Sequence, residues 1–194
     1  MYKNKRGIVF ILAGLLILLS GCANQEASFS KDESEKIPSF DQDVLYEEKT
    51  DGYGFTERTY VIGDQVVAES FGYENDDYAI DIDGDGINEL VCNCMWGGDG
   101  HEETYVYKYE GDKTLVGFIN WLKLDMPGLN YWGVNAVQTH YDSESGKILV
   151  KYYDAKEDAF RDIPVGFDQL EFTQWAEGDE LPFIDMDEAF ERFG

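Results

Sequence analysis

Hydrophobic and polar residues alternate over several short stretches of this chain, which is the spacing of β-strands with one buried face. In TYVYKYE, Tyr105, Tyr107 and Tyr109 share one face of such a strand, and Val106 and Lys108 share the other. The stretches RTYVI, QVVAESF, TLVGFIN and KILVKYYD are also rich in β-branched and aromatic residues. This pattern predicts an all-β fold.

Short turns separate neighbouring stretches. TYVI and QVVA are joined by a Gly-Asp dipeptide, a connection common in β-hairpins, and turns containing Gly111 and Gly146 separate two further pairs. We therefore expect mainly antiparallel hairpins, arranged as a sandwich or an open sheet. The C-terminal stretch DMDEAFERF predicts a short helix, with Asp185 or Asp187 as its cap.

The start of the chain has the pattern of a secretory signal. Basic residues precede twelve apolar residues, Ile8 to Leu19. A membrane-spanning helix takes about 20 residues, so this run fits the hydrophobic part of a signal peptide instead. The run ends in LSGC, residues 19–22, which resembles the lipobox of bacterial lipoproteins. The resemblance implies cleavage before Cys22 and a diacylglycerol thioether on that cysteine.

Three segments follow from these features. Residues 1–21 are predicted to be the lipoprotein signal peptide. Residues 22–39 contain almost no large apolar side chains and cannot bury enough surface to fold, so they are predicted to be a lipidated, flexible tether. Residues 40–194 are long enough for one β-rich domain.

The composition is strongly acidic. The chain has 40 Asp and Glu against 15 Lys and Arg, a formal net charge of −25. This charge repels nucleic acid and anionic lipid headgroups, so we expect no nucleic-acid partner. The membrane is expected to be reached through two acyl chains on Cys22, which anchor stably where one chain does not. The expected location is the extracytoplasmic face of the cell membrane, in a Gram-positive bacterium.

The acids are densest in AIDIDGDGINELVC, residues 79–92. Asp81, Asp83 and Asp85 stand at alternate positions, and Glu89 follows. Clustered carboxylates repel one another unless a cation lies among them. Calcium takes 6–8 oxygen ligands, and the carbonyl of Ile87 is a further candidate. We therefore expect these five residues to hold one calcium ion; the alternative is a metal-free Asp-Gly turn.

Two known calcium loops can be compared with this stretch. Its first positions match an EF-hand, but Cys92 stands where an EF-hand has its last Glu, and no helical pattern flanks the loop. DIDGDGINELV instead resembles the calcium loops of FG-GAP and VCBS-type repeats, which join two β-strands. Glu89 replaces the last Asp of that pattern. The resemblance covers residues 78–118 and implies one propeller-blade-like unit.

Other side chains offer less chemistry. Cys92 and Cys94 are poorly aimed for a disulfide across one residue, so we expect two reduced, buried thiols. With His101 they could form a soft-metal site, although no fourth ligand is evident. The chain has only two histidines and no nucleophile motif, which favours binding over catalysis.

A ligand surface is predicted in GLNYWGVN, where Tyr131 and Trp132 stand among Gly and Asn. The alternative is that the aromatic residues belong to the β core. We therefore predict a non-enzymatic, calcium-stabilised binding or adhesion module for a glycan or a protein. The alternatives are an envelope enzyme acting on an extracellular polymer, and a structural accessory subunit of an envelope complex.

Overall fold

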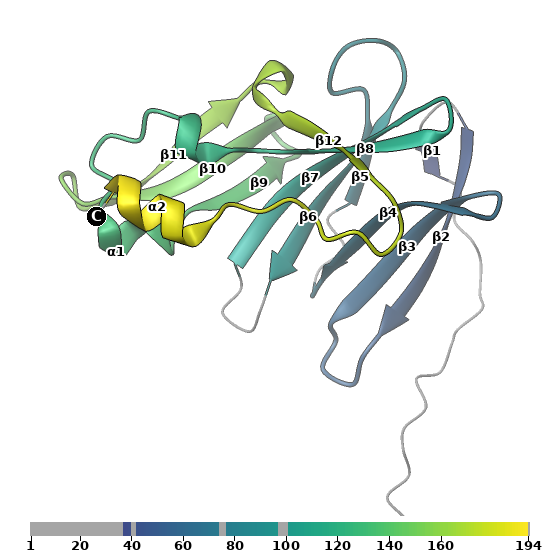
Figure 1. The fold of residues 1–194 in the computed structure, drawn as a ribbon, viewed down its shortest axis with the longest axis horizontal. Helices are drawn as coiled ribbons and strands as arrows, with labels where there is room; N and C mark the ends of the chain where they lie inside the picture. The colour runs from purple at the N-terminus through teal and green to yellow at the C-terminus, as the bar shows by residue number, and fades with distance from the viewer. Residues whose placement is uncertain (1–36, 40–41, 74–76, 97–100, 194) are drawn as a thin grey trace, which may run out of the picture.

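The computed structural model describes residues 37–39, 42–73, 77–96 and 101–193, and these form an all-β fold of three antiparallel sheets (Figure 1). The predicted fold class is confirmed. Cys22, the predicted signal peptide and most of the predicted tether lie outside the described residues. Within the described ranges, no helix is both long enough and apolar enough to cross a membrane.

The central sheet has five strands in the order β12-β8-β7-β6-β5. Four of them follow one another along the chain and pair as a meander: β5 (Asp77–Ile80), β6 (Glu89–Trp96), β7 (His101–Glu110) and β8 (Lys113–Phe118). The fifth, β12 (Glu171–Trp175), pairs with β8. Residues 81–88, called the acidic loop below, connect β5 to β6.

Two smaller sheets lie towards opposite ends of the molecule in Figure 1. One has the order β1-β2-β3-β4 and consists of β1 (Ile37–Ser39), β2 (Gln42–Thr50), β3 (Thr56–Ile62) and β4 (Gln65–Gly72). The other has the order β11-β10-β9 and consists of β9 (Gln138–Asp142), β10 (Lys147–Asp154) and β11 (Ala159–Val165).

The central sheet contributes side chains to two cores because successive residues of a strand point to opposite faces. Leu90, Cys92 and Cys94 of β6 belong to the core that includes residues of β3 and β4. Val91 of β6 and Val106 of β7 belong to the core that includes residues of β9 and β10. The predicted alternation in TYVYKYE is confirmed. Both faces of strands β6 and β7 are covered by apolar cores.

Short helices lie between the strands along the chain and after the last strand. They are α1 (Tyr131–Val134), α2 (Met186–Phe193) and the 3-10 helices η1 (Trp121–Lys123) and η2 (Phe167–Gln169). Helix α2 confirms the predicted C-terminal helix. Its cap is Asp185, whose Oδ1 accepts a hydrogen bond from the backbone N–H of Asp187 at 2.9 Å.

The predicted hairpins are present. The Gly-Asp turn joins β3 to β4, with Ile62 opposite Gln65, and the turns at Gly111 and Gly146 join β7 to β8 and β9 to β10. Strands β2 and β11 have no clear apolar alternation, and the sequence analysis did not predict them. Pairing with a neighbouring strand orders them in spite of their charged residues.

Candidate metal centre

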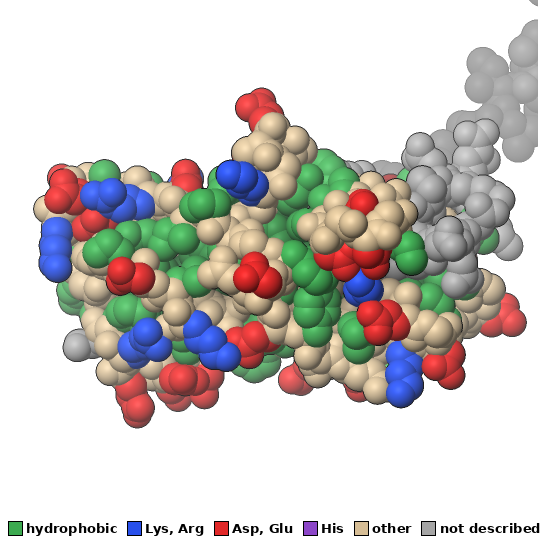
Figure 2. Space-filling view, turned by 90° about the horizontal axis from the view of Figure 1, so that it is seen from above, with side chains coloured by type: hydrophobic (Ala, Val, Ile, Leu, Met, Phe, Trp, Pro, Cys, Tyr) green, Lys and Arg blue, Asp and Glu red, His purple; other side chains and the backbone are tan. Residues whose placement is uncertain are grey.

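The acidic loop closes the hairpin of β5 and β6. Ile80 pairs with Glu89 in the antiparallel ladder, so the loop leaves and re-enters the sheet at adjacent positions. This pairing brings Asp81 and Glu89 to the mouth of the loop, although eight positions separate them in the chain. The loop projects from the upper side of the molecule in Figure 1, and acidic side chains gather around it in the view from above (Figure 2).

Backbone amides hold the aspartates in place. Asp81 accepts hydrogen bonds from the N–H of Gly84 at 2.7 Å and of Gly86 at 3.0 Å. Asp83 accepts one from the N–H of Asp85 at 2.9 Å. Gly84 and Gly86 have φ angles of 82° and 91°, a region that glycine enters without strain. The loop therefore curls round its own carboxylates.

Glu89 differs from the aspartates because it is 1% exposed. Its Oε2 accepts a hydrogen bond from the N–H of Ile82 at 3.1 Å, while its Oε1 is buried with no hydrogen-bond partner. Burial raises the pKa of this carboxyl, and the nearby Asp83 and Asp85 add to the rise. Burying an oxygen without a hydrogen-bond donor destabilises the folded state. A cation bound to Oε1 of Glu89 would relieve this cost.

Three carboxylates converge at this point. One oxygen each of Asp81, Asp83 and Glu89 lies within 4.8 Å of the others. Among the described residues, this is the one group of three or more His, Cys, Asp or Glu side chains with such convergence. An all-oxygen donor set suits hard cations rather than zinc or copper. These residues could hold a metal ion, and they fit the kind of ion that the loop sequence predicts.

The other two predicted ligands, Asp85 and Ile87, do not belong to this convergent group. The side chain of Asp85 lies outside the convergent group, and its Oδ1 accepts the N–H of Ile87 at 2.8 Å. This hydrogen bond, followed by the one from Lys108, lowers the pKa of Asp85. The side chain of Ile87 is an exposed hydrocarbon without a ligand atom, so only its backbone carbonyl could bind a metal.

Lys108 is the residue of this site that the sequence analysis missed. Its Nζ lies 2.5 Å from Oδ2 of Asp83, 3.2 Å from Oδ2 of Asp85 and 3.9 Å from Oε1 of Glu89. Hydrogen bonding to Asp83 is the main cause of a raised pKa for this ammonium. The pairing of Leu90 with Tyr107 places Lys108 beside Glu89 across the ladder. One ammonium therefore neutralises part of the charge of these three carboxylates.

A second carboxylate centre lies at the other end of β5. Oδ2 of Asp77 accepts hydrogen bonds from Tyr60 Oη at 2.5 Å, from Ser70 Oγ at 2.5 Å and from Arg58 Nη1 at 3.0 Å. The thiol of Cys92, opposite Asp77 in the ladder, is also hydrogen-bonded to it. Burial and the neighbouring carboxylate raise the pKa of Tyr60. This cluster joins the sheet of β3 and β4 to the central sheet.

The predicted soft-metal alternative is not assembled within the described part of the chain. Cys92 and Cys94 are buried free thiols, as expected, and burial raises the pKa of both. His101 lies beside Glu103, with 3.4 Å between Nε2 and Oε1. A raised thiol pKa disfavours the thiolate that zinc or copper requires.

The two aromatic residues predicted to form a ligand surface are exposed. Asn130 caps α1 by accepting the N–H of Gly133 at 3.0 Å, and this helix presents Tyr131 at 46% and Trp132 at 82% exposure. The Tyr131 ring lies 4.8 Å from that of Phe190 on α2. Other large aromatic side chains follow the core alternative. Those buried include Tyr60, Tyr105, Tyr107, Trp121, Tyr152 and Trp175.

Comparison of the chain with protein-family models, with curated proteins and with solved structures finds no match.

Proposed function

We propose that this protein is a lipid-anchored, extracytoplasmic binding module stabilised by one calcium ion. The observation that carries the calcium proposal is the buried, unpartnered Oε1 of Glu89, which converges with Asp81 and Asp83. A buried carboxylate beside two others is unfavourable without a compensating charge. A divalent cation would supply that charge and also satisfy the free oxygen.

Calcium fits this donor set better than magnesium. Calcium accepts 6–8 oxygens in flexible geometry, whereas magnesium demands a compact octahedron and retains several waters. Asp85 and the carbonyl of Ile87 are the further ligands implied by the resemblance to FG-GAP and VCBS-type loops. The ammonium of Lys108 would compete with calcium for Asp83, because it lies 2.5 Å from Oδ2 of that carboxylate.

The binding role rests on Tyr131 and Trp132. Helix α1 lies at the end of the molecule opposite β1, the first described strand (Figure 1). A tether attached at Cys22 would therefore join the domain at the end remote from this aromatic pair, which leaves the pair accessible to a ligand. Exposed aromatic rings serve as stacking platforms for sugars and as anchors in protein interfaces, so the proposed ligand is a glycan or a protein.

Calorimetry and thermal melting with calcium test the metal proposal, using a soluble form that begins after Cys22. Extracellular calcium modules bind with dissociation constants of about 10⁻⁴–10⁻³ M. Calcium at about 10- to 100-fold above that constant should stabilise the fold by about 1.4–2.7 kcal/mol. Glu89→Gln should abolish this gain, and Glu191→Gln, on the exposed face of α2, should keep it. The absence of binding heat together with identical melting curves would reject the calcium site.

Two further measurements test the remaining parts of the proposal. Cell fractionation of Cys22→Ser should move the protein out of the membrane fraction. Retention of the variant there, with its signal cleaved, would reject the anchor.

A glycan array probed in calcium should show signals that Trp132→Ala removes. If both proteins bind equally, the ligand surface lies elsewhere.

A further inference from the structure

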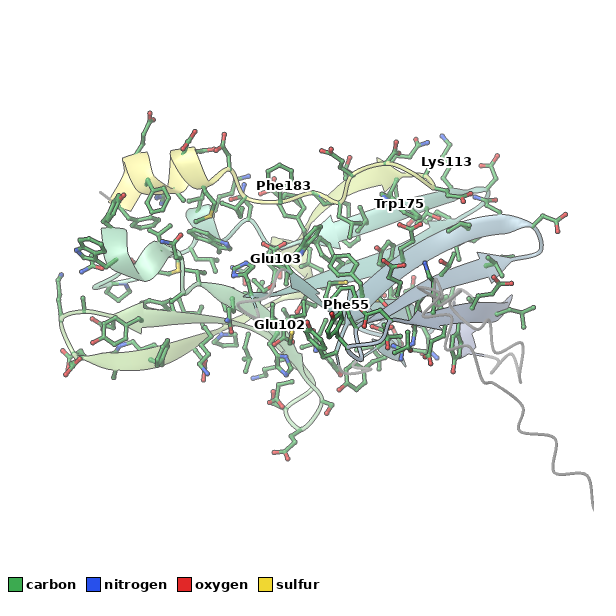
Figure 3. All side chains as sticks on the ribbon, turned by 90° about the horizontal axis from the view of Figure 1, so that it is seen from below. Phe55, Glu102, Glu103, Lys113, Trp175 and Phe183 are labelled. Carbon is green, nitrogen blue, oxygen red and sulfur yellow. The ribbon has the colours of Figure 1, made fainter. Side chains whose placement is uncertain are left out.

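A cavity of about 490 Å³ lies away from the acidic loop, where β3 and β4 meet the end of β6. Its lining combines apolar and charged groups. The apolar part consists of Phe55, Phe71, Met95 and Trp96. In Figure 3, Phe55 lies near the middle of the molecule, close to the strands of the central sheet. This volume falls within the usual range for small-ligand sites, about 300–1,000 Å³.

The aromatic side chains form a connected wall. The ring centroids of Phe71 and Trp96 are 4.6 Å apart at an interplanar angle of 81°. The rings of Phe55 and Phe71 are 6.3 Å apart. Trp96 remains 37% exposed, so part of its indole is open to a ligand. Aromatic faces carry negative electrostatic potential and attract cations within about 6 Å of the ring centre.

The charged part of the lining is acidic in balance. Glu57 and Glu69 both line the cavity. Arg58 also borders it, but its guanidinium is already paired with Glu48 at 3.0 Å and with Asp77 at 3.0 Å. Burial raises the pKa of Glu69, and the neighbouring Glu177 and Glu57 raise it further. The two carboxylates therefore raise the local negative charge. In the ladders of the described strands, Lys49 stands opposite Glu57 and Thr59 stands opposite Glu69, so Glu69 is the carboxylate with less compensation.

We propose that this cavity binds an organic cation, an alkylammonium group whose charge lies against Glu57 and Glu69 and whose carbon stem packs on Phe71 and Trp96. A free amine would bring this chemistry, and so would a lysine side chain of a partner. The site is independent of the calcium loop, and the inference goes beyond the calcium-stabilised binding role.

Three five-carbon probes test the proposal by calorimetry at constant, saturating calcium, so that occupancy of the loop does not vary. They are 1,5-diaminopentane, 1,5-pentanediol and glutarate, which are dicationic, neutral and dianionic. The diamine should bind at least about tenfold more tightly than the diol, and glutarate should not bind. Equal binding of diamine and diol would overturn the proposal.

Matched variants separate a local site from the general acidity of the chain. Glu57→Gln combined with Glu69→Gln should weaken diamine binding by about tenfold or more. Glu188→Gln combined with Glu191→Gln removes the same charge from the exposed face of α2 and should change binding less than about twofold. Equal losses in both double variants would show non-specific attraction and overturn the proposal.

Three additional measurements place the ligand and identify its source. Trp96→Leu should weaken binding through loss of the aromatic wall, with a folded melting transition retained. The diamine should also shift the indole N–H resonance of Trp96 in wild-type protein, and an unshifted resonance would overturn the placement.

Binding of an acetylated Gly-Lys-Gly amide would indicate a lysine of a protein partner, and binding of the diamine alone would indicate a free amine. Binding of neither would overturn the proposal.

Discussion

The two ends of strand β5 carry two carboxylate centres that differ in how their charge is compensated. Asp77, with a side chain 6% exposed, faces a guanidinium and two hydroxyl donors. Glu89, opposite the other end of β5, is also buried, but one of its oxygens has no donor and its nearest ammonium is 3.9 Å away. Both carboxylates are buried at the edge of one hairpin, and only one is satisfied.

The difference separates a structural cluster from a binding site. A buried ion pair with all its hydrogen bonds made holds two sheets together, and removing one partner leaves an uncompensated charge. A buried carboxylate that lacks a donor stores unfavourable free energy until a ligand relieves it. We therefore expect Asp77 to govern stability irrespective of metal, and the acidic loop to govern how stability depends on calcium.

The largest effect is expected for Asp77→Ala. Loss of this carboxylate leaves two hydroxyl groups unpaired and leaves the buried Arg58 with one of its two carboxylate partners, Glu48, so the free energy of unfolding should fall by about 3–5 kcal/mol. Urea unfolding should show the same loss with calcium and with chelator. Ser70→Ala, which removes one donor and leaves the ion pair, should cost only about 1 kcal/mol. A loss that disappears in calcium would place Asp77 in the metal site.

The next effect distinguishes two aspartates of the loop. Asp83 belongs to the convergent group and Asp85 does not. Asp83→Ala should therefore remove the full calcium stabilisation, about 1.4–2.7 kcal/mol at 10- to 100-fold excess, while Asp85→Ala should retain part of it. Thermal melting with and without calcium measures both. Equal losses would indicate that calcium draws Asp85 inward and engages all four carboxylates, as the sequence pattern predicts.

A smaller effect is expected for Lys108→Met. The variant keeps the carbon stem and removes the ammonium that competes for Asp83, so calcium affinity should rise about five- to tenfold. The metal-free variant should also be less stable than the wild type, because three carboxylates lose their neighbouring cation. Calorimetry measures the affinity, and Lys113→Met, on the exposed start of β8, should leave it unchanged. Weaker calcium binding would contradict competition between the two cations.

The smallest effect concerns the pH dependence contributed by Glu69. Its pKa is raised in the folded protein, so the folded state binds more protons than the unfolded state between the ordinary and the raised value. Wild-type stability therefore decreases as pH rises through that interval. Glu69→Gln does not titrate, so its stability relative to the wild type should increase over the same interval, by less than about 1 kcal/mol. A pH-independent difference, measured by urea unfolding, would exclude this cause.

Local patterns were enough to predict much of the fold. Alternation identified TYVYKYE as a strand, turn residues identified three hairpins, and the acidic repeat identified Asp81, Asp83 and Glu89. Each of these signals lies within about a dozen neighbouring residues. Strand β2 was missed because its charged residues hide its pairing, which depends on contacts with β3.

The partners of the acidic residues could not be predicted in the same way. Lys108 lies beside Glu89 only because β6 and β7 pair in one register, and that register was unknown from the sequence. Arg58 and Asp77 are 19 residues apart and belong to different sheets. Their contact results from the packing of whole sheets, which no local pattern encodes.

The pairing of β1 has a mechanical consequence for a protein proposed to be held at its amino-terminal end. Three residue pairs join β1 to β2, whereas seven join β6 to β7. A pull on residue 37 would act on the open end of the β1–β2 hairpin. It would break the residue pairs one after another, from the open end towards the turn. The central sheet would not yet carry the full strain. Strand β1 would then unpair and extend under tension before the rest of the domain unfolds. The acidic loop and α1 would keep their geometry.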